Sequence, residues 1–452
     1  MNRIHFVRAT AGISLALASA LAVGPITAAD AQPERPPNIV VIIADDLGWN
    51  DVGYHGSEIR TPTLDKLAAG GVKLERHYVY PTCSPTRCGI LTGRNPARFK
   101  IHAPIGGRST DALPLDTMTL ARALKSAGYE TGLVGKWHLG LRPEVGPRKY
   151  GFDQSYGYLH GQIDPLTHRY KNGDRTWHRN DEFIDEPGHA TDLLAAEAVK
   201  FVSTKRDKPF LLWAAFSVPH TPLAEAAEWT KPYEGKIADP SRRLYAAAVT
   251  HLDAAIGRVV AALEKAGQLD NTLILFTSDN GGQNGWRGGQ EYEGRYEPQP
   301  TLGNNKPLRD WKGSLYEGGV RVPAFVSYPG KLQPGILEKP VTLLDWLPTL
   351  SAVAGVQVDD AWKLDGRNVW PLLAPADAQV DVPLAALFWN TGKNIGILSD
   401  NRKMIAPANG QSPPQLYDLA ADPFEEHDLA AGNADMQKEL AGRLQATRKL
   451  HE

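Results

Sequence analysis

Polar residues of the kinds that bind metals and move protons follow four apolar segments of this sequence. The segments cover residues 38–43, 131–134, 209–216 and 271–277. The polar residues that follow them are, in the same order, Asp45 and Asp46, Lys136 and His138, His220, and Asp279 and Asn280. If the segments are strands of an open α/β sheet, their carboxyl ends share one edge, which is where such sheets bind ligands. We therefore expect these side chains to meet in one crevice.

Each of these residues alone has an ordinary structural explanation, such as a helix cap, a tight turn or a hydrogen-bonded histidine. Together they suggest a metal site. Asp45, Asp46, Asp279 and Asn280 offer three carboxylates and one amide, which are hard oxygen ligands. Such ligands suit Ca²⁺ or Mg²⁺ and suit zinc poorly.

A second candidate functional segment covers residues 81–94, PTCSPTRCGILTGR. Pro85 suits an early helical position and Gly93 suits a helix end, so Cys83 is predicted to lie at a helix N-terminus. The backbone N–H groups and the dipole favour an anion there. Arg87 lies one turn further along the same face, where it can point towards Cys83 or a ligand bound to it.

Composition excludes several classes of protein. Only two of the 452 residues are cysteine, which cannot form a disulfide scaffold or a Cys-x-x-Cys zinc or redox centre. The net charge of −2 leaves no basic surplus for binding nucleic acid. With 42% hydrophobic and 22% charged residues, the chain has the composition of a globular protein with a large core.

Short apolar runs alternate with helical patterns, which predicts an α/β fold: a large, mostly parallel sheet flanked by helices. The expected helices cover residues 61–69, 116–127, 191–205 and 243–266. Beyond about residue 370, short runs broken by turn residues predict a smaller α+β domain with a short antiparallel sheet and a terminal helix over 435–450. The predicted domains are therefore residues 32–370 and 371–452.

The N-terminus has the pattern of a secretory signal peptide. Two arginines precede an uncharged run over residues 9–29, and Ala29-Asp30-Ala31 offers a cleavage site. The alternative is an uncleaved membrane anchor, which the Gly24-Pro25 break disfavours. We expect residues 1–31 to be removed, and the mature protein to be periplasmic or secreted with no stable membrane insertion.

The Cys-x-Pro-x-Arg pattern at 83–87, followed by Leu-Thr-Gly at 91–93, resembles the signature of the type I sulfatases, members of the alkaline-phosphatase superfamily. The resemblance extends over residues 37–429. It includes Asp45-Asp46, residues 135–140 (GKWHLG), 279–282 (DNGG), Lys312-Gly313, 316–321 (YEGGVR), 416–419 (LYDL), Asp422-Pro423 and Glu425. Asp428 stands where members of the family often have asparagine. Around residues 150–182 and 283–311 the chain is most similar to the arylsulfatase B, or N-acetylgalactosamine-4-sulfatase, branch.

The resemblance implies that a formylglycine-generating enzyme oxidises Cys83 to formylglycine during maturation. One hydroxyl of the hydrated aldehyde would attack sulfur, and the other would be deprotonated to expel sulfate. Asp45, Asp46, Asp279, Asn280 and the modified Cys83 would bind Ca²⁺. Arg87 would orient the formylglycine, and Lys136 and Lys312 would pair with sulfate oxygens. His138 would be the base, and His220 the acid that protonates the leaving oxygen.

Two segments rich in aromatic and charged residues, 150–182 and 283–311, follow predicted strands and could line a substrate crevice. Aromatic rings suit sugars, and arginine suits uronate or sulfate groups. The predicted substrate is therefore a sulfated carbohydrate, or an aryl sulfate. Cys88 is predicted to be a buried packing residue, since a disulfide with Cys83 would join side chains that a helix points apart.

Two other functions fit these residues. The crevice could serve a phosphate or phosphonate monoester, as in other hydrolases of the same superfamily. If Cys83 stays a thiol, the protein could instead be a non-catalytic binder of sulfated glycans.

Overall fold

The computed structural model describes residues 1, 35–374, 382–383 and 386–451. Residues 36–452 form one compact unit. The predicted signal peptide lies outside the described residues apart from Met1, and the domain boundary at residue 370 stays a prediction.

Five parallel strands form the centre of a ten-stranded sheet. In spatial order they are β9 (Thr272–Ser278), β1 (Asn38–Ala44), β8 (Phe210–Ala215), β4 (Glu130–Lys136) and β5 (Gln154–Tyr158). Strand β1 is fully buried, as expected for a strand covered on both faces. The four predicted strands are confirmed, and β4 extends two residues beyond its predicted end, to Lys136.

Short strands extend both edges of the sheet. Beyond β9 lie β10 (Ala324–Ser327), β2 (Val72–Leu74) and β11 (Gly335–Leu337), and beyond β5 lie β6 (Trp177–Arg179) and β7 (Glu182–Phe183). Strand β10 is antiparallel to β9, and β6 is antiparallel to β5. A separate parallel pair is formed by β3 (His77–Tyr78) and β12 (Val341–Thr342). The predicted fold, a large and mostly parallel sheet, is confirmed.

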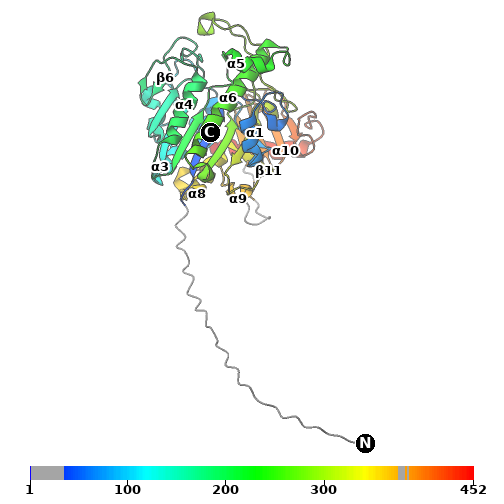
Figure 1. Ribbon diagram of the computed structural model, residues 1–452. Coiled ribbons are helices and arrows are strands. Elements are labelled where there is room, and N and C mark those ends of the chain that lie inside the picture. The colour runs from blue at the N-terminus through cyan, green and yellow to red at the C-terminus, as the bar shows by residue number, and fades with distance from the viewer. Residues whose placement is uncertain (2–34, 375–381, 384–385, 452) are drawn as a thin grey trace. The chain divides into compact units, whose positions relative to one another are not determined.

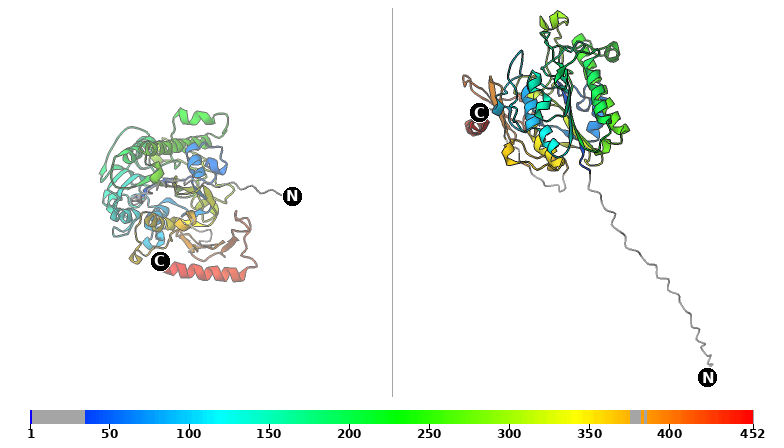
Figure 2. Two further views of the ribbon diagram at one scale, coloured as in Figure 1. Left: turned by 60° about the horizontal axis from the view of Figure 1, so that its bottom comes forward. Right: turned by 90° about the vertical axis from the view of Figure 1, so that its left-hand side faces the viewer.

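Helices cover both faces of the sheet (Figure 2). On one face lie α1 (Pro62–Ala69), α4 (Ala190–Ser203) and α6 (Pro240–Lys265), which are side by side in Figure 1. On the other lie α2 (Cys83–Thr92), α3 (Leu120–Ser126) and α8 (Trp346–Val353). Successive side chains of strand β1 point to opposite faces and so contribute to both layers. Val40 and Ile42 pack in the core beneath α1, α4 and α6, whereas Ile39 and Val41 pack in the core on the other face. The remaining short helices are α5 (Ala227–Thr230), α7 (Glu317–Val320) and α9 (Trp370–Leu373).

The prediction of a helix over residues 116–127 is wrong at its start. Helix α3 begins only at Leu120, because the Thr119 side chain accepts a hydrogen bond from the N–H of Arg122 and so caps the first turn.

The C-terminal region contains the predicted antiparallel sheet and terminal helix. The strands β13 (Leu387–Asn390), β14 (Asn394–Ser399), β15 (Arg402–Pro407) and β16 (Gln415–Asp418) pair in order, and α10 covers Ala434–His451. Phe388 packs with Leu440 and Leu444 of α10, whereas Leu387 and Trp389 belong to the core of the large sheet. The small sheet is thus held between α10 and the main body.

Within the described part of the chain, α6 alone is long and apolar enough to cross a membrane by those two criteria. Of its most apolar stretch, 67% is buried against the rest of the fold, as in the core helix of a globular domain.

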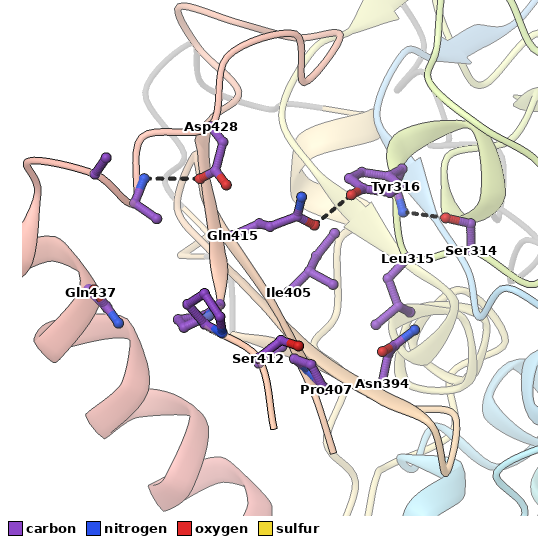
Figure 3. A pocket seen from close by; sticks show the side chains of 15 residues that line it. Ser314, Leu315, Tyr316, Asn394, Ile405, Pro407, Ser412, Gln415, Asp428 and Gln437 are labelled. Atoms are coloured by element: carbon purple, nitrogen blue, oxygen red, sulfur yellow. Dashed lines mark hydrogen bonds between the residues drawn. The ribbon is translucent and has the colours of Figure 1, made fainter. Parts of the chain in front are cut away.

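A cavity of about 700 Å³ lies where the small sheet meets residues 314–316 (Figure 3). The Tyr316 hydroxyl donates to Gln415 across it. At its rim Asp428 accepts hydrogen bonds from the N–H groups of Leu416 and Ala430, so this exposed aspartate fixes a turn. None of the predicted site residues lines this cavity.

A buried ion cluster joins the small sheet to the main body. Lys403 of β15 contacts Glu317 Oε1 and Glu425 Oε1, each at 2.9 Å, and its side chain is fully buried. Glu317 also accepts from the Tyr78 hydroxyl, and its N–H donates to Glu425 Oε2. Glu317 and Glu425, which belong to segments distant in sequence, therefore share one lysine, Lys403.

Replacing Lys403 with methionine is expected to lower the free energy of unfolding by about 3–5 kcal/mol, because it removes the cation that two buried carboxylates share and leaves Glu317 only Arg321, at 3.7 Å. Denaturant unfolding of this variant provides the measurement. Lys438→Met, at an exposed position of α10, is the matched control and should change stability by less than about 0.5 kcal/mol. Equal stability of the two variants would contradict the role assigned to Lys403.

Candidate active site

The carboxyl ends of adjacent parallel strands bring the predicted polar residues together. Ala44, at the end of β1, pairs with Ser278, at the end of β9, and Gly135 of β4 pairs with Ala215 at the end of β8. Asp279 is joined to β1 by its own N–H, which donates to the carbonyl of Ala44. The predicted convergence of these strand ends is confirmed, and a crevice beside them stays a prediction.

One half of the site is a buried network around Asp45 and Asp279. Lys136 Nζ lies 2.7 Å from Asp45 Oδ2, and both side chains are fully buried. Arg87 binds Asp279 Oδ2 through Nη2 at 2.7 Å and through Nε at 3.1 Å. Its Nη1 donates to the carbonyl of Lys136. Arg87 therefore joins helix α2 to the ends of β9 and β4.

The other half is built around Asp46. Lys312 Nζ lies 2.7 Å from Asp46 Oδ2, Asn280 Nδ2 donates to Asp46 Oδ1 at 2.8 Å, and His220 Nε2 lies 3.7 Å from Oδ2. Asp46 has a φ of 67°, in the left-handed region that is uncommon for a residue with a side chain. Such backbone strain is characteristic of functional sites.

Glycines let the loops of this site approach each other closely. A Cβ atom on Gly281 would lie 1.7 Å from the carbonyl oxygen of Gly318, and the Gly281 N–H donates to the carbonyl of Gly319. This contact joins the segment of Asp279 and Asn280 to the segment that follows Lys312.

Two buried oxygen atoms of the predicted metal ligands have no hydrogen-bond partner: Asp45 Oδ1 and Asn280 Oδ1. Unpaired buried oxygens of this kind are costly unless a cation or a donor meets them. In addition, Asp45, Asp46 and His220 each place one potential ligand atom within 4.8 Å of the other two. The oxygen-rich set predicted from the sequence therefore fits a hard divalent cation such as Ca²⁺.

The charges of the three carboxylates and three cations at this site cancel when all six groups are ionised. Asp45, Asp46 and Asp279 face the three cations Arg87, Lys136 and Lys312. Burial and the neighbouring Asp279 raise the pKa of Asp45 to about 8, so this carboxylate would be stabilised by more positive charge. Although burial opposes it, Lys312 holds the pKa of Asp46 below its usual range. A bound Ca²⁺ would leave the site with a net charge of +2.

Cys83 is the first residue of α2, as predicted, and is 3% exposed. Burial raises the pKa of its thiol, although Lys136 opposes the shift. A thiol with a raised pKa is a poor nucleophile at neutral pH. Gly93 ends α2 with a φ of 63°, as its position predicted. Cys88 is fully buried in the core and, like Cys83, is not part of a disulfide.

His138 is held in one tautomer. Its Nε2 lies 2.7 Å from the carbonyl of Ile105, which only accepts, so Nε2 carries the proton and Nδ1 carries the lone pair. Nδ1 is buried without a partner. Burial, together with Lys136 and Arg87, lowers the pKa of His138 well below its usual value, so the ring is a neutral potential base.

In His220 the other ring nitrogen, Nδ1, makes the contact with a backbone carbonyl. Its Nδ1 lies 2.6 Å from the carbonyl of Thr221, so Nε2 is the nitrogen that faces Asp46. With Nδ1 donating to this carbonyl, Nε2 carries the lone pair, and burial together with Lys312 lowers the pKa of His220 to about 3. The ring is therefore neutral, and it could donate from Nε2 only after taking up a proton there.

Several positioning residues were not predicted. Ser84 donates to the carbonyl of His138 and accepts from the N–H of Ile105. It therefore fixes both the backbone of His138 and the residue whose carbonyl binds the His138 ring. On the other side of the site, the Tyr245 hydroxyl lies within hydrogen-bond distance of the Asp46 carbonyl and of Asp51, which pairs with Arg242 at 2.7 Å. Their only sequence signal is proximity to a predicted residue, as with Ser84 beside Cys83.

The two aromatic-rich segments pack against each other. Lys171 Nζ contacts Glu291 Oε1 at 2.7 Å, and Arg295 contacts Asp164 at 3.0 Å. A cavity of about 490 Å³ adjoins the first segment. Its lining includes Arg108, Arg142, His160, Arg175 and Phe183. The N–H of His138 donates to the carbonyl of Leu159, the residue before His160, so this cavity lies near the predicted base.

Comparisons with known proteins agree with this geometry. The profile of the family described as Sulfatase matches residues 37–356. Arylsulfatase J of Mus musculus is 34% identical, covering 90% of this chain and 75% of its own length. Arylsulfatase A of Homo sapiens is 31% identical, covering 96% and 89%.

Among solved structures, Ps i-CgsB in complex with k-i-k-neocarrahexaose superposes with a TM-score of 0.80 at 32% identity, covering 92% of this chain and 93% of that chain. These relatives do not single out the arylsulfatase B branch. The family match covers more than half of the chain and includes its strand-end residues and the Cys83 segment. The chain therefore belongs to the sulfatase family of sulfuric ester hydrolases.

Proposed function

We propose that this protein hydrolyses sulfate monoesters of carbohydrates, using a formylglycine derived from Cys83 and a Ca²⁺ ion. The observation that carries the proposal is the buried cluster of three carboxylates and three cations beside Cys83, with two unpaired oxygens. A neutral cluster that gains +2 on binding Ca²⁺ would attract an anionic ester and stabilise charge on its oxygens.

Asp45, Asp46, Asp279 and Asn280, with the modified Cys83, would hold the ion, which supplies positive charge for a sulfate oxygen and a nucleophilic hydroxyl. The hydrated aldehyde at position 83 would supply that hydroxyl, a better nucleophile here than a buried thiol of raised pKa. Arg87 keeps its guanidinium on Asp279 and the Lys136 carbonyl, so it would hold the start of α2 in place for attack.

Lys136 and Lys312 would each share their ammonium between a carboxylate and a sulfate oxygen. Without substrate they bind Asp45 and Asp46, each at 2.7 Å. His138 Nδ1 would take the proton that releases sulfate, and His220 Nε2 would give a proton to the leaving oxygen.

A sulfated carbohydrate is the proposed substrate class. The cavity beside His160 is lined by three arginines and Phe183, and also by Glu144 and by Asp174, which pairs with Arg108 at 2.9 Å. Arginine side chains and an aromatic ring are groups that suit an anionic sugar. Ps i-CgsB, whose structure contains an oligosaccharide, supports the same assignment. Resemblance to the arylsulfatase B branch would refine it to an N-acetylgalactosamine sulfate.

The N-terminal pattern of residues 1–31 supports export to the periplasm or the exterior. Because formylglycine formation needs a separate enzyme, we propose that a formylglycine-generating enzyme acts on the 83–87 signature during maturation.

Cys83→Ala is expected to reduce turnover of an aryl sulfate by at least about 10⁴-fold, because it removes the nucleophile. The fold should survive, since the change shortens a buried side chain without adding volume. Cys88→Ala, at the other buried cysteine, is the control and should retain activity. Comparable activity in Cys83→Ala and Cys88→Ala would exclude Cys83 as the nucleophile.

Faster hydrolysis of a matched aryl phosphonate by the wild type would favour the phosphonate hydrolase alternative.

Removing Ca²⁺ with a chelator is expected to abolish turnover and to lower stability, and adding Ca²⁺ should restore both. At Ca²⁺ about 100-fold above its dissociation constant, the free energy of unfolding should rise by about 2.7 kcal/mol. Thermal unfolding with and without Ca²⁺ measures the shift. Asp46→Asn should show a much smaller shift, whereas Asp270→Asn, in an exposed turn, should behave as wild type. An equal shift in Asp46→Asn would refute the assigned ligands.

A further inference from the structure

A second cluster of metal-binding side chains lies outside the proposed active site. It combines His189 and Asp192 at the start of α4, Glu225 in the loop before α5, and His251 in the middle of α6. The aromatic rings of His251 and His189 lie 4.9 Å apart, and Trp229 stacks on His251 at 4.4 Å. The sheet does not contribute to this cluster, and the proposed hydrolysis does not use it.

The contacts of His251 are those of a metal ligand held by a carboxylate. Its Nδ1 lies 2.8 Å from Glu225 Oε2, so this nitrogen donates and Nε2 can carry the lone pair. Its Nε2 lies 3.2 Å from Asp192 Oδ1. Two ligands of a tetrahedral zinc ion at about 2.0–2.1 Å are separated by about 3.3 Å. A carboxylate on the second ring nitrogen is the usual means of orienting a histidine ligand.

An unpaired buried oxygen points into the same cluster. The Glu225 side chain is 1% exposed, and its Oε1 has no hydrogen-bond partner. This oxygen lies 3.8 Å from His189 Nε2. One ligand atom from each of His189, Asp192 and His251 lies within 4.8 Å of the other two. A cation would meet the lone pairs of these three ligand atoms and draw them together.

We propose that His189, Asp192 and His251 bind Zn²⁺, and that Glu225 orients His251. Two imidazoles and carboxylate oxygens form the kind of ligand set that zinc takes, in contrast to the oxygen-rich set around Asp45. Three present contacts would change on binding. The Nδ1 of His189, which now accepts from the N–H of Thr191, would carry the ring proton once Nε2 binds the ion. His189 Nε2 would leave the Ala224 carbonyl at 2.9 Å, and Arg258, which is 47% exposed, would give way at Asp192.

Zinc bound at this cluster would also affect the loop that carries His220. Glu225 follows His220 by five residues and is hydrogen-bonded to His251 of α6. An ion held by His251 and by the start of α4 would therefore connect this loop to both helices through Glu225. We infer that zinc here stabilises the position of the loop and takes no part in the chemistry.

The test is zinc binding to the Ca²⁺-saturated protein, by equilibrium dialysis and elemental analysis. Wild type should retain one Zn²⁺ that His251→Asn loses, and Glu225→Gln should bind it about 10–100-fold more weakly. His427→Asn, in an exposed cluster with Asp422 and Glu426, is the control and should retain the ion.

Co²⁺ in place of zinc provides a second readout, since a tetrahedral site with histidine ligands gives visible absorption that His251→Asn should lack. If His251→Asn does not fold, Asp192→Asn should show the same losses. No bound zinc in wild type, or equal zinc in wild type and in both variants, would overturn the proposal. These results are independent of sulfatase turnover, because the Ca²⁺ ligands and Cys83 are unchanged.

Discussion

The buried balance of charge between three carboxylates and three cations is the constraint on which this structure depends. Asp45, Asp46 and Asp279 could not be buried together without cations, because unpaired carboxylates repel one another and lose their hydration. Arg87, Lys136 and Lys312 supply those cations from three separate elements. The strands, helix α2 and the loop of Lys312 must therefore meet at one point for the site to be stable.

The same constraint explains how a nearly neutral protein could act on an anion. Its net charge of −2 provides no general attraction. A cluster that is balanced without a metal becomes strongly positive when a divalent cation binds, and burial strengthens the effect at short range. The structure would thus focus positive charge on the reacting group, with further arginines near His160 for the rest of the substrate.

Much of the fold and the candidate site could be predicted from the sequence, because long apolar strands and the polar residues after them carry strong local signals. Strands β1, β8 and β9 and helix α10 were predicted within about two residues. The edge strands could not be predicted, because pieces of two to four residues such as β7 and β11 carry no periodic pattern. The contacts of Ser84 with Ile105, and of Lys403 with Glu317 and Glu425, join distant segments and leave no local trace.

The central claim is that Cys83 is the precursor of an aldehyde placed beside a calcium site. Its most direct test is mass spectrometry of the tryptic peptide of residues 77–87, from protein made in its native host. The account predicts that an active preparation contains formylglycine, or its hydrate, at position 83 and an unmodified Cys88 elsewhere in the digest. An active preparation in which Cys83 is entirely a thiol would contradict it.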